Sequence, residues 1–369
     1  MKFLISGGGT GGHIFPAVSI ADALRKLQPD CEILFVGALG RMEMTRVPEA
    51  GHRIVGLPIQ GFNRQQLWKN IRIPILLWKS IRQAKRIVRM FRPNAAIGVG
   101  GYASGAAMVA ADMLNVPVLL QEQNSFAGIT NRWLARKASR ICVAYNGMER
   151  FFPAEKIVLT GNPIRQNLIT DSEDRAKGFA HFDLFPQRKT LLVIGGSLGA
   201  HTINQSILAH LETLIQSEIQ VIWQTGKNYI GKAREAVAPY DCQNIFITDF
   251  IDRMDYAYGV ADLVISRAGA SSISELCLLG KPAILVPSPN VAEDHQRHNA
   301  MALVNKEAAL LVEDACAKDS LVPQALSLIR QEERLKTLSK NIYSLAEHNS
   351  AERIAQEVIA LSKKYGTQK

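Results

Sequence analysis

Short runs of aliphatic residues alternate with longer segments of helical periodicity along the whole chain. This alternation is typical of parallel α/β domains, in which covering helices join buried strands. In the first half, the pattern predicts strands over Lys2–Ser6, Glu32–Val36, Arg53–Leu57, Ala95–Gly98, Pro117–Gln121 and Ile141–Ala144. A second series is expected over Thr190–Ile194, Gln220–Gln224, Ile245–Thr248, Leu263–Ser266, Ala283–Pro287 and Ala309–Val312.

Each series begins with a strand that runs directly into a glycine-rich loop. The first loop reads GGGTGG at 7–12, and the second reads GGSLGA at 195–200. We therefore expect an α/β protein of two doubly wound domains in tandem, with a boundary near TGNPIR at 160–165. The end of the chain carries Ile354, Val358 and Leu361 at helical spacing and is expected to form one helix.

The composition is typical of a soluble protein of the reducing cytoplasm. Of the 369 residues, 47% are hydrophobic and 21% are charged, and the length suits two domains that each bury a core. The five cysteines are far apart and form no C-x-x-C pair, which favours packed thiols. No stretch has the pattern of a signal peptide or of a membrane span.

The net charge of +10 is concentrated in one segment. Residues 51–111 contain ten basic residues and no acidic one, so the rest of the chain is balanced. Within 77–92, one helical face is apolar (Leu77, Ile81, Ala84, Val88, Phe91) and the opposite face is basic (Lys79, Arg82, Arg86, Arg89). This face is either an ordinary solvated surface or, with Trp68 and Trp78 beside it, a site for an anionic membrane. Nucleic acid fits less well, because stacking aromatics are few.

The opening loop, SGGGTGGH at 6–13, fits the G-x-G-x-x-G spacing of dinucleotide sites. Such a site requires an acidic residue at the end of the second strand to bind the ribose, and that strand ends LFVGALG without one. The glycines then indicate close approach of a diphosphate or a sugar to the backbone. His13, in the first turn of the following helix, is either a capping or packed histidine or a general base.

Two polar motifs follow strands of the second half. SRAGASSISE at 266–275 offers small residues, helix-end N–H groups and a carboxylate, which suit a diphosphate and a ribose; a plain capped helix is the alternative. VAEDHQRHNA at 291–300 is suited to sugar hydroxyls or is a solvated loop. No metal site is expected, because the histidine spacing is unsuitable and no D-x-D element is present.

Seven motifs in order resemble the MurG family, the bacterial transferases that use UDP-N-acetylglucosamine to convert lipid I to lipid II in peptidoglycan synthesis. The motifs are GGTGGHIFPA (8–17), GVGGYASG (98–105), QEQNSFAGITNRWLA (121–135), TGNPIR (160–165), GGSLGA (195–200), SRAGASSISE (266–275) and EDHQRHNA (293–300). The resemblance implies a GT-B fold, with two Rossmann-like domains facing a cleft. It assigns 1–162, completed by the helix 349–366, to an acceptor- and membrane-facing domain and 163–348 to a UDP-sugar-binding domain.

The resemblance also implies roles for individual residues. His13 is the expected base, which takes a proton from the 4-hydroxyl of the muramoyl sugar during inverting transfer without a metal or other cofactor. The expected donor-binding residues are Thr10, Gly11, Gly12, Asn124, Arg165, Ser197, Phe250, Ile251, Ala270, Ser271, Ser272, Ile273, Ser274, Glu275 and Gln296. The candidate acceptor contacts are Tyr102, Ser104 and Glu122. Arg297 departs from the pattern, because some members carry a second glutamine there.

The expected partners are UDP-N-acetylglucosamine, lipid I, an anionic membrane surface and proteins of cell-wall synthesis. The expected location is peripheral, on the cytoplasmic face of the plasma membrane. The residues alone leave two alternatives open. One is another GT-B enzyme, either a glycolipid synthase or a UDP-N-acetylglucosamine epimerase. The other is a non-catalytic protein that binds a nucleotide sugar or nucleic acid.

Overall fold

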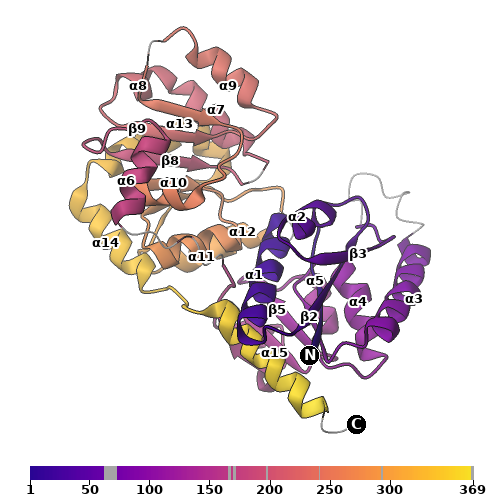
Figure 1. Cartoon of the computed structure of the whole chain (residues 1–369). Helices are drawn as coiled ribbons and strands as arrows, with labels where there is room; N and C mark the ends of the chain where they lie inside the picture. The colour runs from indigo at the N-terminus through magenta and orange to yellow at the C-terminus, as the bar shows by residue number, and fades with distance from the viewer. Residues whose placement is uncertain are drawn as a thin grey trace. The chain divides into compact units, whose positions relative to one another are not determined.

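The computed structural model describes residues 1–61, 73–164, 168, 172–196, 198–240, 242–291 and 294–366. The chain divides into two compact units (Figure 1). Unit 1 comprises Met1–Arg165 and Glu347–Lys369, and unit 2 comprises Gln166–Ala346. The sequence analysis set the corresponding boundaries at 162/163 and 348/349.

Unit 1 contains a seven-stranded parallel sheet in the order β3-β2-β1-β4-β5-β6-β7. The strands are β1 (Lys2–Ser6), β2 (Glu32–Ala38), β3 (Arg53–Leu57), β4 (Ala95–Gly98), β5 (Val118–Glu122), β6 (Arg140–Val143) and β7 (Ile157–Leu159). The helices are α1 (Gly11–Leu27), α2 (Glu43–Glu49), α3 (Ile73–Phe91), α4 (Tyr102–Asp112), α5 (Ile129–Leu134) and α15 (Ser350–Gly366), with short 3₁₀ turns at Met148–Arg150 and Ala154–Lys156.

The inner strands of unit 1 are buried on both faces, which explains their nearly continuous apolar sequences. Phe3 and Ile5 of β1 belong to the core that α1 and α15 complete, whereas Leu4 faces the core formed with α3 and α4. The last helix of the chain, α15, lies beside α1, the first (Figure 1).

Unit 2 repeats the plan with a six-stranded parallel sheet in the order β10-β9-β8-β11-β12-β13. Its strands are β8 (Thr190–Ile194), β9 (Gln220–Gln224), β10 (Ile245–Thr248), β11 (Leu263–Ser266), β12 (Ala283–Leu285) and β13 (Leu310–Leu311). Its helices are α6 (Ser172–His181), α7 (His201–Ala209), α8 (Leu211–Gln216), α9 (Ile230–Val237), α10 (Met254–Val260), α11 (Ala270–Leu279), α12 (His295–Val304), α13 (Asp314–Ile329) and α14 (Glu332–Tyr343).

In each unit the strand order reverses beside the first strand. The switch lies between β1 and β4 in unit 1 and between β8 and β11 in unit 2. In doubly wound sheets, ligands bind outside the carboxyl ends of the strands at such a point. The glycine loops that follow β1 and β8 are therefore placed where this fold binds ligands.

The structure confirms the two doubly wound domains. All twelve expected strands are present, seven of them with the expected bounds and the others with one or both ends shifted by one or two residues. The sequence analysis missed β7, a three-residue edge strand. Across the described ranges, no helix combines the length and apolar character that spanning a membrane requires.

Candidate functional site

The loop after β1 brings backbone donors to the start of α1. Thr10 occupies the N-cap with extended backbone angles, and its carbonyl accepts the N–H groups of His13 and Ile14. Gly9 has a φ of 89° and is exposed, as is Thr10. The first turn of α1 contains no acidic side chain of its own that would oppose an anionic ligand at its positive dipole end.

His13 lies where the two glycine loops of unit 1 meet. Its Nδ1 is 3.1 Å from the carbonyl oxygen of Gly8 and 3.4 Å from the hydroxyl of Thr10. A Cβ built on Gly100, in the loop after β4, would lie 2.8 Å from His13 Nε2. A Cβ on Gly101 would lie 2.4 Å from the carbonyl oxygen of Gly8. The motifs at 8–17 and 98–105 are thus in direct contact at the switch point, with the half-buried imidazole between them.

Glu43, at the start of α2, is a buried residue of this site that the sequence analysis missed. Its carboxylate is 0% exposed and accepts the N–H groups of Gly9 and Ala38 at 2.9 and 3.0 Å. The sequence analysis looked for an acid at the end of β2 that would bind a ribose. An acid does stand near that strand end, but it faces inward and binds the glycine loop. The motif RME at 41–43 carried no periodic signal that would have identified it.

The loop after β5 is organised by Glu122, an expected acceptor contact. Glu122 is 2% exposed, and its carboxylate accepts the backbone N–H groups of Asn124 and Gly128. It also accepts the side-chain amides of Asn124 at 3.2 Å and of Asn131 at 2.9 Å. Asn124, an expected sugar contact, is half-buried at this strand end. The bonds of Glu122 indicate that it shapes the loop on which Asn124 stands.

The other two candidate acceptor contacts differ in accessibility. Tyr102, the first residue of α4, is 53% exposed and packs against Gly61. Ser104 is 0% exposed, and its hydroxyl is enclosed close to Gly98. Direct contact between Ser104 and an acceptor therefore finds no support in this structure.

In unit 2, α11 begins at the switch point with an open first turn. Gly269 is its N-cap, and Ala270–Leu279 contains no acidic residue in the first turn. The hydroxyl of Ser274 donates to the carbonyl of Ala270, whereas that of Ser271 is enclosed without a partner among the described residues. Ser272 is half-buried and Ile273 is buried in the core. The start of α11 thus presents backbone N–H groups at a ligand-binding position of the fold.

Glu275 lies one turn into α11 and is 8% exposed. Its Oε2 accepts the hydroxyl hydrogen bond of Tyr258, from α10, at 3.0 Å. This contact fixes the carboxylate, and a hydrogen bond to a charged group is stronger than one between neutral groups.

Gly11 and Gly12 are the first two residues of α1, and three further described donor candidates lie in unit 2. Phe250 is half-buried and Ile251 is 5% exposed, and the hydroxyl of Thr248 donates to the carbonyl of Phe250 at 2.7 Å. The Oε1 of Gln296, at the start of α12, accepts the N–H of Ser288 at 2.9 Å. Arg297 pairs with Glu313 at 2.8 Å on the surface. Arg165, Ser197 and Trp68 lie outside the described residues.

The basic face predicted in unit 1 lies on α3. Ala84 and Val88 are buried, and Leu77, Ile81 and Phe91 pack on the same core, so the expected apolar face is confirmed. Lys79, Arg82, Arg86 and Arg89 are exposed. Trp78 is 59% exposed, and the Arg82 guanidinium lies 5.4 Å from its ring centroid.

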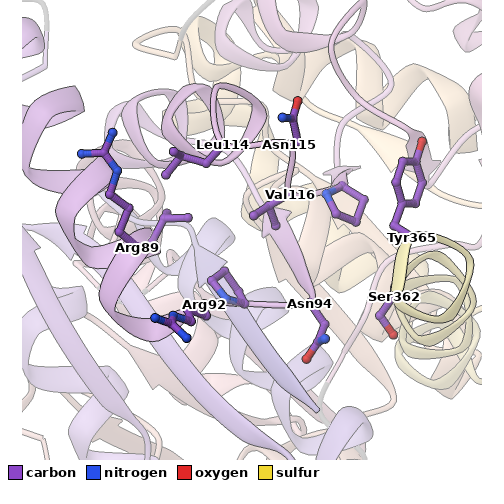
Figure 2. Close-up of a pocket in the computed structure, with 11 residues that line it drawn as sticks. Arg89, Arg92, Asn94, Leu114, Asn115, Val116, Ser362 and Tyr365 are labelled. Atoms are coloured by element: carbon purple, nitrogen blue, oxygen red, sulfur yellow. The ribbon is translucent and has the colours of Figure 1, made fainter. Parts of the chain in front are cut away.

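A cavity of about 360 Å³ lies at the C-terminal end of α3. Figure 2 shows the residues that line it. Arg89, Arg92, Asn94 and Asn115 line it, together with Tyr365 of α15. Its lining loops precede β4 and β5 and so lie at the amino ends of the strands, whereas His13 lies at the carboxyl ends. The cavity and His13 are therefore at opposite ends of the strands.

Two cysteines show the packed state expected for thiols. Burial raises the pKa of the Cys142 and Cys277 thiols to about 12, so both stay protonated at neutral pH. Within the part of the chain that the structure describes, no group of three or more His, Cys, Asp or Glu side chains gathers as a metal site.

Comparison with known families matches both units. Residues 3–143 match the glycosyltransferase family 28 N-terminal domain, and residues 190–358 match the glycosyltransferase family 28 C-terminal domain. A relative from Parabacteroides distasonis is 57% identical over 360 residues, which cover 98% of both chains. One from Bacteroides fragilis is 58% identical over 364 residues, covering 98% of this chain and 96% of the relative. Both are named UDP-N-acetylglucosamine–N-acetylmuramyl-(pentapeptide) pyrophosphoryl-undecaprenol N-acetylglucosamine transferase.

Solved structures agree with the fold. The crystal structure of Acinetobacter baumannii MurG matches with a TM-score of 0.75 and 27% identity, over 97% of this chain and 99% of that one. The Neisseria meningitidis UDP-GlcNAc 2-epimerase matches with a TM-score of 0.68 and 15% identity, over 98% and 100%. The second match shows the fold alone. Together with the two parallel sheets, these structures confirm the GT-B class. By its identity to the curated relatives over nearly the whole length, the chain belongs to the UDP-N-acetylglucosamine–N-acetylmuramyl-(pentapeptide) pyrophosphoryl-undecaprenol N-acetylglucosamine transferases of glycosyltransferase family 28.

Proposed function

We propose that the protein transfers N-acetylglucosamine from UDP-N-acetylglucosamine to the 4-hydroxyl of the muramoyl sugar of lipid I and so forms lipid II for peptidoglycan synthesis. The observation that carries this proposal is 57% identity to a transferase of that name over 98% of both chains. The contact between His13 and the two glycine loops of unit 1 supports it, because a titratable group lies where the fold binds ligands.

His13 acts as the general base. Its Nδ1 donates to the carbonyl of Gly8, which favours the tautomer whose lone pair is on Nε2. Nε2 takes the proton of the acceptor hydroxyl as that oxygen forms a bond to the anomeric carbon of the donor sugar. The bond from that carbon to the diphosphate breaks with its electron pair, and UDP leaves. One displacement inverts the α linkage of the donor to β.

The donor binds mainly to unit 2. The first turn of α11, from Ala270 to Ser274, offers N–H groups to the diphosphate, whose charge increases as it leaves. Glu275, held by Tyr258, accepts hydrogen bonds from the ribose hydroxyls. The further donor contacts in this proposal are Thr10, Gly11, Gly12, Asn124, Arg165, Ser197, Phe250, Ile251 and Gln296.

The N–H groups of α11 also provide a way to stabilise UDP without a metal ion, and we include metal-independent transfer in the proposal. Of the three acceptor candidates, Tyr102 is exposed at the start of α4, and Glu122 acts through the loop that it shapes. The lipid tail of the acceptor requires a membrane. We assign the exposed basic face of α3 and Trp78 to peripheral docking on an anionic cytoplasmic membrane surface.

The experiment that tests the reaction measures UDP release from UDP-N-acetylglucosamine with and without a lipid I analogue. The parent protein is expected to release UDP only when the acceptor is present. His13→Ala is expected to lower kcat roughly 10²- to 10⁴-fold, the usual contribution of a general base. UDP binding by calorimetry should stay at the parent value, because the donor lies mainly on unit 2.

Three outcomes would contradict parts of this proposal. Release of UDP without acceptor would favour the epimerase alternative. Absence of turnover, with intact nucleotide binding, would favour a binding protein. Parental kcat in His13→Ala would exclude His13 as the base while leaving the transferase assignment in place. His210→Ala, at the C-cap of α7 in unit 2, is the matched histidine control.

A further inference from the structure

The carboxylate of Glu43 joins the ends of two neighbouring strands in unit 1. Its Oε2 accepts the N–H of Gly9, in the loop after β1, at 2.9 Å. Its Oε1 accepts the N–H of Ala38, the last residue of β2, at 3.0 Å. The side chain is fully buried, and carboxylate oxygens only accept hydrogen bonds. Buried charge is costly without such donors, so the carboxylate and the loop stabilise one another in this position.

Two glycines make room for this side chain. A Cβ on Gly8 would lie 2.2 Å from Glu43 Oε1, and a Cβ on Gly37 would lie 2.6 Å from Glu43 Cγ. Neither glycine has a φ in the left-handed range, so the available space, not the backbone conformation, excludes a larger residue here. The first glycine loop is therefore shaped around Glu43 as well as open to a ligand.

Gly8 connects Glu43 to the proposed base. Its carbonyl oxygen lies 3.1 Å from His13 Nδ1. The same residue is in contact with the second glycine loop through Gly101. Glu43 thus holds the peptide segment whose carbonyl orients the imidazole.

We propose that Glu43 is a positioning residue for the transfer reaction: it fixes the loop 7–10, and thereby the direction of the His13 imidazole, before substrates bind. This inference rests on the proposed role of His13. A loop that is already in place costs no ordering free energy when the acceptor arrives. Loss of Glu43 therefore lowers kcat more than it lowers the affinity for the donor, which binds mainly to unit 2.

The test compares Glu43→Gln with Glu49→Gln on the same helix. The first variant keeps the size of the side chain, but its amide NH₂ group faces one of the two N–H donors. The second changes an exposed carboxylate that pairs with Arg46 at 2.9 Å. The readouts are kcat, the KM for UDP-N-acetylglucosamine, the stoichiometry of UDP binding, and amide hydrogen exchange over residues 7–13.

Glu43→Gln is expected to lower kcat by about 10- to 100-fold, as a misplaced catalytic group does, and to speed amide exchange at Gly9. The UDP stoichiometry should match that of the parent, and any rise in the KM for the donor, through Thr10, should be smaller than the fall in kcat. Glu49→Gln should match the parent throughout. A fall in kcat that only follows a fall in UDP stoichiometry would overturn the proposal, because it would reflect unfolded protein. Parental kcat, or unchanged exchange at Gly9, would overturn it as well.

If Glu43→Gln does not fold, Glu43→Asp decides the question, because it keeps the charge but is one methylene shorter and reaches the two donors less well. An intermediate loss of kcat with faster exchange at Gly9 supports the proposal, and parental values of both contradict it. The proposed function fails separately, through the parent protein, if UDP release does not depend on acceptor. Parental kcat in His13→Ala would refute the role of His13 as the base. It would not affect the amide hydrogen exchange measured at Gly9 in Glu43→Gln.

Discussion

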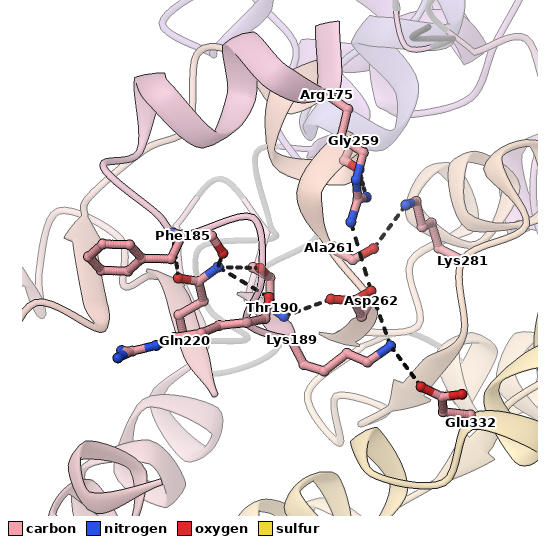
Figure 3. Close-up of polar contacts among 11 residues, drawn as sticks. Arg175, Phe185, Lys189, Thr190, Gln220, Gly259, Ala261, Asp262, Lys281 and Glu332 are labelled. Carbon is pink, nitrogen blue, oxygen red and sulfur yellow. Dashed lines mark hydrogen bonds and ion pairs between the residues drawn. The ribbon is translucent and has the colours of Figure 1, made fainter. Parts of the chain in front are cut away.

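Lys281, in the turn between α11 and β12, shows how the fold changes the ionisation of a single residue. Burial, aided by the nearby charge of Arg175, lowers the pKa of its ammonium group to about 8, although Asp262 opposes the shift. Figure 3 shows Lys281 Nζ donating to the carbonyl of Ala261, at 2.9 Å. Asp262 is shared with Arg175 and Lys189, each at 3.9 Å, and accepts the N–H of Thr190.

The depressed pKa of Lys281 makes stability depend on pH. Below pH 8 the lysine is charged in both states, so the folded state carries the full cost of a buried charge. Between pH 8 and the ordinary value of 10.5, the unfolded chain binds the proton and the folded one does not, so stability rises with pH. Lys281→Met should therefore raise the free energy of unfolding at pH 7, by up to about 3 kcal/mol, and this gain should disappear near pH 10.5.

Thermal unfolding of parent and variant between pH 7 and 10.5 measures this difference. Lys336→Met, at an exposed lysine of the same surface that pairs with Glu333, is the control and should change little at any of these pH values. Two results would show that the buried charge of Lys281 does not destabilise the protein: a Lys281→Met variant less stable than the parent at pH 7, or a gain in stability that does not change with pH.

His13 and Glu43 illustrate which site residues a sequence can reveal. His13 follows a glycine pattern that has a known physical meaning, so the sequence predicts a role for it. Glu43 bonds to the backbone of Gly9, 34 positions away, and backbone partners leave no residue type in the sequence to recognise. For Glu122, the sequence predicts a candidate contact, but the burial of the side chain and its four hydrogen bonds to the loop and to α5 appear only in three dimensions.

At the scale of elements, α15 belongs to the core of unit 1 although it ends the chain. Ile354, Ala355 and Val358 are 0% exposed and complete the core that α1 and β1 begin. Arg353 donates to the carbonyl of Leu159 in β7 and pairs with Glu347. The periodicity of Ile354, Val358 and Leu361 predicted the helix, but an amphipathic pattern does not say which surface the helix covers.

This packing predicts that a defect in α15 destabilises unit 1. Val358→Asp introduces a carboxylate into an apolar core and should cost on the order of 4 kcal/mol. Calorimetry should show one transition at lower temperature, and hydrogen exchange should localise the loss of protection to 1–165. Unit 2 should keep its protection. Gln356→Asp introduces the same residue on the exposed face of the helix and is the control. Equal destabilisation by both variants would contradict the role of α15 in this core.

The sequence predicts the central strands of a sheet more accurately than a short strand at the sheet edge. β8 and β11 lie in the middle of their sheet, are buried throughout and are mostly apolar, so their bounds follow directly from the pattern. β7 has only three residues, is half-buried and lies at the sheet edge. A segment that short has no hydrophobic period to detect. Its assignment as a strand rests on its pairing with β6, which appears only in three dimensions.

At the scale of the whole molecule, the positive charge is concentrated on part of one unit. The ten basic residues of 51–111 account for the net charge of +10, and four of them lie exposed along α3. A charge excess on one surface produces a local field, whereas the same excess spread over the molecule produces only solubility. Trp78 and Ile75, also on α3, are each 59% exposed. They add apolar area of the kind that enters a lipid headgroup layer.

Reversal of three of these charges, with Arg82, Arg86 and Arg89 changed to Glu, should therefore weaken binding to vesicles that contain anionic lipid. Each basic residue near such a surface contributes about 1 kcal/mol, so the partition coefficient should fall at least about 100-fold at low salt. Sedimentation with anionic and with neutral vesicles measures this effect, and high salt should weaken vesicle binding by the parent in the same direction.

A matched variant with Lys318, Arg330 and Lys340 of unit 2 changed to Glu has the same net charge as the α3 variant and should bind vesicles like the parent. Because the acceptor is anchored in lipid, turnover on vesicles should fall with binding in the α3 variant, whereas turnover of a soluble acceptor analogue should not. Equal binding by the α3 variant and the parent would show that the basic face of α3 is an ordinary solvated helix face.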